Sequence, residues 1–222
     1  VYWAFGKHLG TAVAQSRKGD VLGDVRDLKV NSNSLGRGYQ NSLGQPFHTD
    51  SCDVVGLLVL RTAKEGGLSK IASSVAIHNV LAQERPEVLA AMYEPLYLYP
   101  PDRGDKPWRQ PMYSVHEGHF CCKTVGLYAR MAQERFPELP RLSPLHLEGL
   151  RLLQEIADRP DIHFTMMFQP GDLQLLNNHV TVHGRTGYVD YDDEDRKRHL
   201  LRLWLSVPNS RPLSPSMAEF FG

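Results

Sequence analysis

The 222-residue sequence has few cysteines: only Cys52, Cys121 and Cys122. Three cysteines do not make the paired framework of small secreted domains, and no two have the spacing of a structural zinc site. We therefore expect a reducing, cytoplasmic compartment and a fold stabilised by its hydrophobic core. Cys52 is expected to be a small buried hydrophobic residue, and the adjacent cysteines to point to opposite faces of a strand.

The chain also lacks an excess of charge of either sign, because 25 Lys and Arg balance 25 Asp and Glu. Neither a basic surface for nucleic acid nor an apolar run approaching the ~18 residues of a membrane span is present. We expect no nucleic-acid partner, no membrane association and no signal peptide. Because the chain begins with Val1 and not Met, we expect a natural N-terminal segment to be missing. The oligomeric state, including a homo-oligomer, stays open.

The glycine-rich strand-to-helix fingerprint of doubly wound nucleotide-binding folds is absent as well. Short strand patterns instead run through the chain, while helical patterns gather in its middle. Strands are expected at 20–30, 53–60, 68–73, 112–115, 118–122, 161–168, 172–176 and 199–207. Helices are expected at 2–15, at 75–93 with a break at Pro86, at 124–135, and from Pro144 onwards with Ser143 as N-cap. The proline-rich stretch 99–111 is expected to be a long loop, and 190–197 an exposed excursion.

This order of elements predicts a mainly β protein with a jelly-roll, cupin-like sandwich. We expect one domain over residues 1–222, with a helical insert at about 74–158.

His48 and Asp50 stand one residue apart at the mouth of an apolar strand. Alternate side chains of extended backbone share a face, so an imidazole and a carboxylate would point the same way. A third ligand could come from His179 or His183, and His183 is preferred because it ends the apolar alternation of its strand. Two histidines and one carboxylate leave three metal positions open, which is typical of non-haem Fe(II) oxygenases. The alternative is a chance spacing, since the chain has ten histidines.

Arg198 and Arg202 lie four residues apart in a strand pattern and therefore point to one face. Burying two guanidinium groups in a sheet core is costly without anionic partners. Arginine is suited to two-pronged recognition of a carboxylate. A bound carboxylate is favoured, and salt bridges at the sheet edge are the alternative.

Four segments together resemble the taurine/2-oxoglutarate dioxygenase (TauD/TfdA-like) family. They are PFHTD at 46–50, GGLS at 66–69, NNHVTVHGR at 177–185 and RKRHLLRLWL at 196–205. The resemblance extends from about Gln15 to Pro208 and implies a double-stranded β-helix, in agreement with the jelly-roll pattern.

The resemblance implies that His48, Asp50 and His183 ligate Fe(II). It also implies that Arg198, fifteen residues beyond His183, holds the far carboxylate of 2-oxoglutarate with help from Ser69. Arg202 is then expected near the other end of this cosubstrate or near an anionic group of the substrate.

The function implied is an Fe(II)/2-oxoglutarate-dependent dioxygenase that oxidises a C–H bond of a small metabolite, anionic or derived from an amino acid. 2-Oxoglutarate and O2 would give succinate and CO2. Because Asp50 occupies the position that halogenating relatives leave vacant, hydroxylation, desaturation or cyclisation is expected. Two alternatives stay open: a non-catalytic cupin-like protein that binds a metal or carboxylate, and a metal-dependent hydrolase or isomerase with the same triad.

Overall fold

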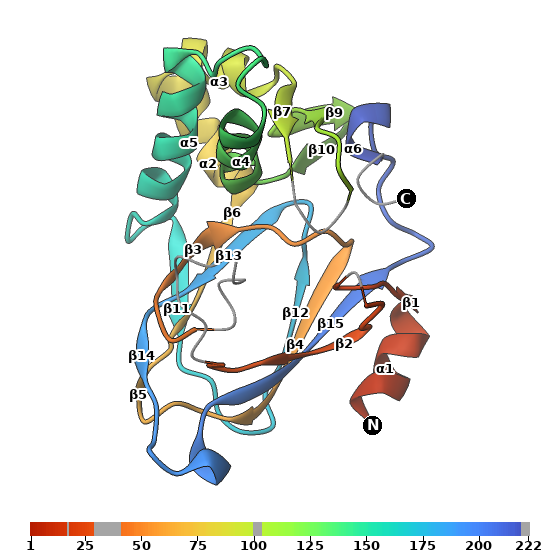
Figure 1. Ribbon diagram of the computed structural model, residues 1–222, viewed down its shortest axis with the longest axis vertical. Coiled ribbons are helices and arrows are strands. Elements are labelled where there is room, and N and C mark those ends of the chain that lie inside the picture. Colours follow the sequence, from red (N-terminus) through yellow and green to blue (C-terminus); the bar gives the residue numbers. More distant parts are fainter. Residues whose placement is uncertain (17, 29–40, 100–103, 219–222) are drawn as a thin grey trace.

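Two antiparallel sheets make the body of the protein in the computed structural model, which describes residues 1–16, 18–28, 41–99 and 104–218. The first sheet has the order β1-β15-β4-β12, with β2 also paired to β15. Its strands are β1 (Thr11–Ala12), β2 (Leu22–Val25), β4 (Val54–Arg61), β12 (Leu173–Asn177) and β15 (His199–Ser206). The second sheet has the order β11-β6-β13-β3, with β3 (Gln45–His48), β6 (Ser69–Ser73), β11 (His163–Met166) and β13 (Thr181–Arg185). This is the predicted double-stranded β-helix, or jelly-roll (Figure 1).

Alternation along β15 decides what points between the sheets. Leu200 is buried with Val25, Val59 and Phe168 in a cluster at one end of the sandwich. The intervening leucines face outward, where Leu203 packs beneath Tyr2 of helix α1 (Tyr2–Leu9). Arg202 therefore lies on the interior face of β15, and Arg198 immediately precedes the strand.

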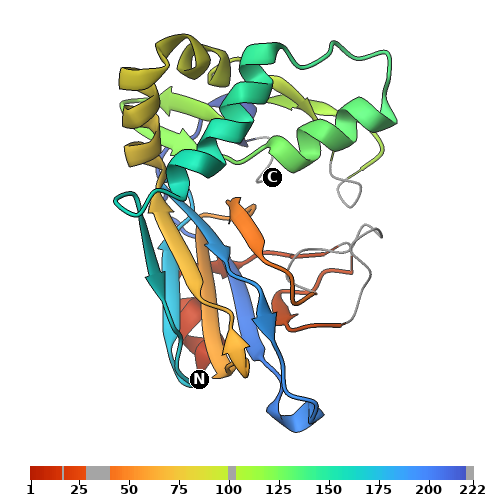
Figure 2. The same cartoon turned by 90° about the vertical axis from the view of Figure 1, so that its left-hand side faces the viewer.

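The segment between β6 and β11 forms a helical layer at one end of the sandwich (Figure 2). It contains α2 (Ser74–Glu84), α3 (Pro86–Met92), α4 (Gly126–Arg135) and α5 (Pro144–Ala157). Two hairpins accompany them, β7 (Leu96–Leu98) with β8 (Trp108–Gln110) and β9 (Tyr113–His116) with β10 (His119–Cys122). Together these elements bury a large hydrophobic cluster.

Local signals fix the ends of these helices. The Ser73 hydroxyl accepts a hydrogen bond from the Ala76 backbone, and Pro86 opens α3 at a first-turn position. Ser143 caps α5 through a reciprocal capping box with His146, as its sequence position predicts. Among the described residues, every helix is too short or too polar to cross a bilayer.

Two expectations about local structure are wrong. The N-terminal helix ends at Leu9 instead of continuing to residue 15, because the chain is extended from Gly10 onwards and pairs with β15 through β1, so close to it that a Cβ at Gly10 would collide with the Ser206 carbonyl. The stretch 99–111 is not entirely a loop, since β8 pairs antiparallel with β7. Residues 29–30 of the predicted strand and 100–103 of the predicted loop lie outside the described residues.

The remaining short elements join the two sheets and close the chain. Strands β5 (Glu65–Gly66) and β14 (Tyr188–Val189) pair at one corner of the sandwich, and a 3-10 turn, η2 (Glu194–Arg196), lies in the exposed excursion before β15.

Gly66 and Gly67, at the corner formed by β5 and β14, both have positive φ angles near +72°. A Cβ at Gly66 would collide with the Gly187 carbonyl, so this corner requires glycine. The corner leads directly into Ser69. Helix α6 (Pro215–Ala218) follows β15.

Candidate metal centre

The three predicted ligands converge between the sheets. His48 and His183 are direct partners in the β3–β13 ladder, and their ring centroids lie 4.2 Å apart. Asp50 follows two residues after the end of β3, outside the ladder but still on the same side. One potential ligand atom from each of the three residues lies within 4.8 Å of the others.

The hydrogen bonds of His48 leave its outer nitrogen available as a ligand. Nδ1 lies 3.0 Å from the Pro46 carbonyl, which only accepts, so Nδ1 carries the proton. Nε2 is then the unprotonated nitrogen, and its lone pair accepts from the Gln45 amide at 3.0 Å, a hydrogen bond that a metal ion at Nε2 would replace. Metal-binding histidines commonly donate their other ring N–H to a backbone carbonyl or carboxylate, which fixes the imidazole tautomer.

The protonation states of the other two residues also suit a cation. Burial, and next the neighbouring His48, lower the pKa of His183 to about 3, so its imidazole is neutral. Burial would raise the pKa of Asp50, but the charge of Arg202, together with the nearby His183 and His48 and a hydrogen bond from Trp204, lowers it overall. Neutral imidazoles and an ionised carboxylate are the forms that bind metals.

A set of buried polar groups holds the loop that carries Asp50. The Asn178 side chain accepts from the Asp50 backbone N–H at 2.9 Å and donates to the carbonyls of Asp50 and Cys52. The Lys123 ammonium lies 3.5 Å from the carbonyls of Asp50 and Asn178. Trp204 Nε1 donates to Asp50 Oδ2 at 2.9 Å. Both the backbone and the carboxylate of Asp50 are therefore fixed in place.

His179 does not join this group. Its Nε2 lies 2.7 Å from Asp53 Oδ1, and its Nδ1 lies 3.3 Å from the Cys121 thiol. Since a carboxylate only accepts, Nε2 donates to Asp53, and Nδ1 accepts from the thiol. Ser210 also donates to Asp53, which ties the C-terminal segment to this pair. His179 has a structural position behind the Asp50 loop, and Cys52 is a buried hydrophobic residue packed with Val55 and Trp204.

A cavity of about 450 Å³, including the part open to solvent, is lined by the two histidines of this group. Both sheets contribute to its wall. Its lining comprises Val25, Gln45, His48, Leu57, Ser69, Phe168, His183, Gly184, Arg185, Arg198 and Arg202. The predicted 2-oxoglutarate residues, Arg198, Arg202 and Ser69, therefore line the same cavity as the two histidines.

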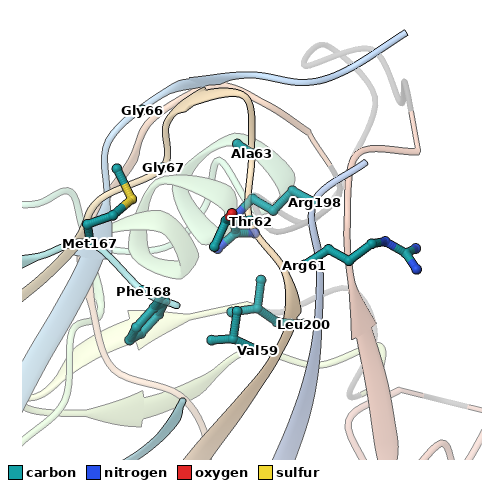
Figure 3. A pocket seen from close by; sticks show the side chains of 10 residues that line it. All are labelled: Val59, Arg61, Thr62, Ala63, Gly66, Gly67, Met167, Phe168, Arg198 and Leu200. Carbon is teal, nitrogen blue, oxygen red and sulfur yellow. The ribbon is translucent and has the colours of Figure 1, made fainter. Parts of the chain in front are cut away.

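Arg198 is the cation in this cavity with an unused donor. Its Nη1 is buried and has no hydrogen-bond partner among the described residues. Burial, and next the nearby Arg185, lower its pKa to about 10, so the guanidinium is still charged at neutral pH. Arg198 also lines a second hollow of about 210 Å³ beside Gly66, Gly67 and Phe168, from which Arg61 points away (Figure 3). An anion could approach Arg198 from the cavity side.

Arg202 has a different environment. Its Nε donates to Gln15 Oε1 at 2.8 Å, and its Nη1 lies 3.7 Å from Asp50 Oδ1. The guanidinium stacks 4.6 Å from the centre of the Trp204 ring. Arg202 thus neutralises the carboxylate of Asp50, while Ser69 Oγ accepts from Gln174 at 3.2 Å.

These residues fit a divalent metal with a dicarboxylate beside it. The centre offers two nitrogen donors and one carboxylate on one side, and His183 Nδ1 is buried without a partner in the described part of the chain. Sequence reasoning missed Trp204, Gln45 and Lys123 as parts of the centre. Trp204 shares the inward face of β15 with Arg198 and Arg202, so alternation could have found it. Lys123 had no comparable signal.

Residues 1–204 match the model of the family described as "Taurine catabolism dioxygenase TauD, TfdA family". FR-33289 synthase of Streptomyces rubellomurinus is 37% identical over 230 residues, which cover 96% of this chain and 65% of that protein. Taurine hydroxylase-like protein SAT17 of Stachybotrys chartarum is 31% identical over 179 residues, or 79% of this chain and 45% of that protein. The chain thus spans less than two thirds of the length of these relatives.

Solved structures share the fold at lower identity. Asparagine oxygenase (AsnO) superposes with a TM-score of 0.71 at 22% identity, covering 96% of this chain and 65% of that one. The non-haem iron oxygenase OrfP, in complex with Fe and alpha-ketoglutaric acid, gives a TM-score of 0.66 at 16% identity, covering 92% and 63%. The fold, the family match and the sequence relatives agree: the chain belongs to the TauD/TfdA dioxygenase family.

Proposed function

We propose that this chain is an Fe(II)/2-oxoglutarate-dependent dioxygenase that oxidises a C–H bond of a small metabolite. The observation that carries the proposal is the convergence of His48, Asp50 and His183 beside a cavity that contains the unpartnered Nη1 of Arg198. A metal centre and an anion site in one cavity are what a keto-acid cosubstrate requires.

In this proposal His48, Asp50 and His183 hold Fe(II), and Arg198 receives the far carboxylate of 2-oxoglutarate, with Ser69 beside it. When bound, the iron and the keto acid supply oxidation by O2 with release of succinate and CO2. The chain binds and orients both partners. Because Asp50 and His183 are buried, they would shield a bound metal on their side from water, which would strengthen the charged contacts there.

The substrate proposed is a small metabolite, anionic or derived from an amino acid. The family match and the protein relatives support a small-molecule oxygenase. Among the structural neighbours, asparagine oxygenase is in complex with Fe(II), 2S,3S-3-hydroxyasparagine and succinate, and OrfP with Fe, succinate and (3S)-hydroxy-L-Arg. Because Asp50 is a carboxylate, hydroxylation, desaturation or cyclisation is proposed. Three free, buried cysteines support a reducing, cytoplasmic location.

The test is an anaerobic titration of the Fe(II)-loaded protein with 2-oxoglutarate, observed through the weak visible metal-to-ligand charge-transfer band. The expected result is a saturable band in the wild-type protein and none in His48→Ala. Absence of the band from a folded, metal-loaded wild-type protein would contradict the proposal. Activity with zinc and without 2-oxoglutarate would then favour a hydrolase or isomerase, and binding without turnover would favour a cupin-like binding protein.

A further inference from the structure

The indole of Trp204 is placed directly against the carboxylate of Asp50. Trp204 lies on the interior face of β15, and its Nε1 donates to Asp50 Oδ2 at 2.9 Å. Both side chains are buried, with 6% and 8% of their surfaces exposed. Hydrogen bonds from an N–H to an ionised carboxylate, shielded from water, are among the stronger ones in proteins.

Neighbouring groups hold this indole in one orientation. Arg202 stacks on one face of the ring at 4.6 Å, and its Nη1 lies 3.7 Å from the other carboxylate oxygen, Oδ1. Cys52 and Val55 pack against the same side chain. The indole N–H can only donate a hydrogen bond, so Asp50 Oδ2 must be the acceptor. Oδ1 and Oδ2 therefore have different fixed partners.

We propose that Trp204 is a positioning residue that restricts Asp50 to binding the metal through a single oxygen. This inference rests on the proposed function. An oxygen that already accepts from an N–H is a weaker metal donor than its partner, because its electron density is shared. Removing the donor would allow both oxygens of Asp50 to bind, and a two-oxygen carboxylate would occupy one of the three positions that the cosubstrate and O2 need.

The variant that tests this is Trp204→Phe, which keeps an aromatic ring beneath Arg202 but removes the N–H. The matched control is Trp108→Phe, because Trp108 is half-buried and its Nε1 also donates a hydrogen bond, to Gln110, in a hairpin away from the centre. The measurement is the affinity of the Fe(II)–2-oxoglutarate complex for nitric oxide, an O2 surrogate, followed by electron paramagnetic resonance. The Fe(II) affinity is measured in parallel.

The expected result is nitric-oxide binding weaker by about tenfold or more in Trp204→Phe, with wild-type behaviour in Trp108→Phe. A purely structural role of Trp204 would change the thermal stability or the Fe(II) affinity but leave nitric-oxide binding of the loaded protein unchanged, and that outcome would overturn the inference. Failure of the wild-type protein to form the Fe(II)–2-oxoglutarate complex would instead contradict the proposed function.

If Trp204→Phe does not fold, the N–H can be removed with less change of shape. The variant Trp3→Phe/Trp108→Phe retains Trp204 as its single tryptophan, since the chain has three. Expression with 3-benzothienylalanine then replaces the indole N–H by sulfur at this one position. The same loss of nitric-oxide binding is expected, and unchanged binding would again overturn the inference.

Discussion

His48 and His183 face each other as direct partners across the β3–β13 ladder. Backbone hydrogen bonds of the sheet therefore set the separation of their rings, and no flexible loop intervenes. A shift of one residue in this register would turn one of the two rings to the opposite face of the sheet. The candidate metal centre thus inherits the rigidity of the sandwich, with only Asp50 contributed from outside a strand.

Arg198→Ala is expected to weaken 2-oxoglutarate binding by about 10–100-fold, because a buried, charge-assisted pair of hydrogen bonds is lost. Binding of Fe(II) is expected to change little, since Arg198 does not contact the three metal-site residues. The measurement is the charge-transfer titration at increasing 2-oxoglutarate. Arg109→Ala is the matched control, because Arg109 is exposed in β8 and donates to the Pro95 carbonyl, in a hairpin away from this cavity. Equal 2-oxoglutarate affinity in Arg198→Ala and wild type would contradict the assignment.

Ser69→Ala is expected to raise the 2-oxoglutarate KM by only about fivefold, which corresponds to the loss of one hydrogen bond of about 1 kcal/mol from an uncharged hydroxyl donor. Ser69→Thr retains the hydroxyl and should restore most of the affinity. Steady-state succinate formation at varied 2-oxoglutarate provides the comparison. An effect in Ser69→Ala as large as that of Arg198→Ala would show that the division of roles is wrong.

Asn178→Ala is expected to lower the free energy of unfolding by about 2–4 kcal/mol, because three buried backbone groups each lose a hydrogen bond. Fe(II) affinity should fall as well, since the Asp50 loop is no longer fixed. Denaturant unfolding and Fe(II) titration measure the two effects. Asn177→Ala is the neighbouring control, because Asn177 is exposed and its side chain accepts a single bond, from the His179 N–H. Equal behaviour of the two variants would rule out the role given to Asn178.

The Asp53–His179 pair should make stability depend on pH. Burial would raise the pKa of Asp53, but hydrogen bonds from His179, Val207 and Ser210 lower it to about 2 from its usual value near 3.8. Burial is the main cause that lowers the pKa of His179 from its usual 6.5. Both shifts mean that the unfolded chain binds more protons than the folded chain below pH 6.5. The free energy of unfolding therefore falls as the pH decreases through this window.

Asp53→Asn should remove the Asp53 part of this dependence, which amounts to about 2 kcal/mol between pH 4 and pH 2. Urea unfolding at several pH values measures the slope. Exposed Asp105 supplies the control Asp105→Asn. A wild-type slope in Asp53→Asn would show that this pair does not set the acid stability.

Local sequence signals were sufficient for several parts of the fold. Ser143 and Pro144 fix the start of α5 through a cap and a first-turn proline, and Pro86 separates α2 from α3. Alternation along β15 placed Arg198 and Arg202 on one face. Each of these depends on residues within one turn or one strand of each other, so a single sequence contains the whole signal.

Other parts depend on long-range contacts that leave no local pattern. Gln15 contacts Arg202 from 187 residues away, and Asn178 contacts Asp50 from 128 residues away. Strand β8 is short and lies in a proline-rich stretch, so only its pairing with β7 makes it a strand. The sequence could therefore indicate which residues form the candidate metal centre, but not which distant side chains, such as Gln15, hold those residues in position.

Arg198 stands immediately before β15 of one sheet, and His48 and His183 lie in strands of the other, which under the proposed function has a consequence for cosubstrate choice. Facing sheets pack about 10 Å apart, and core side chains keep that gap nearly constant. The separation between the metal ligands and the guanidinium is then set by the architecture, and a diacid must bridge it with a carbon backbone of matching length. Oxaloacetate, one carbon shorter, and 2-oxoadipate, one carbon longer, should each fit less well than 2-oxoglutarate, so selection among 2-oxo acids becomes a property of the sandwich itself.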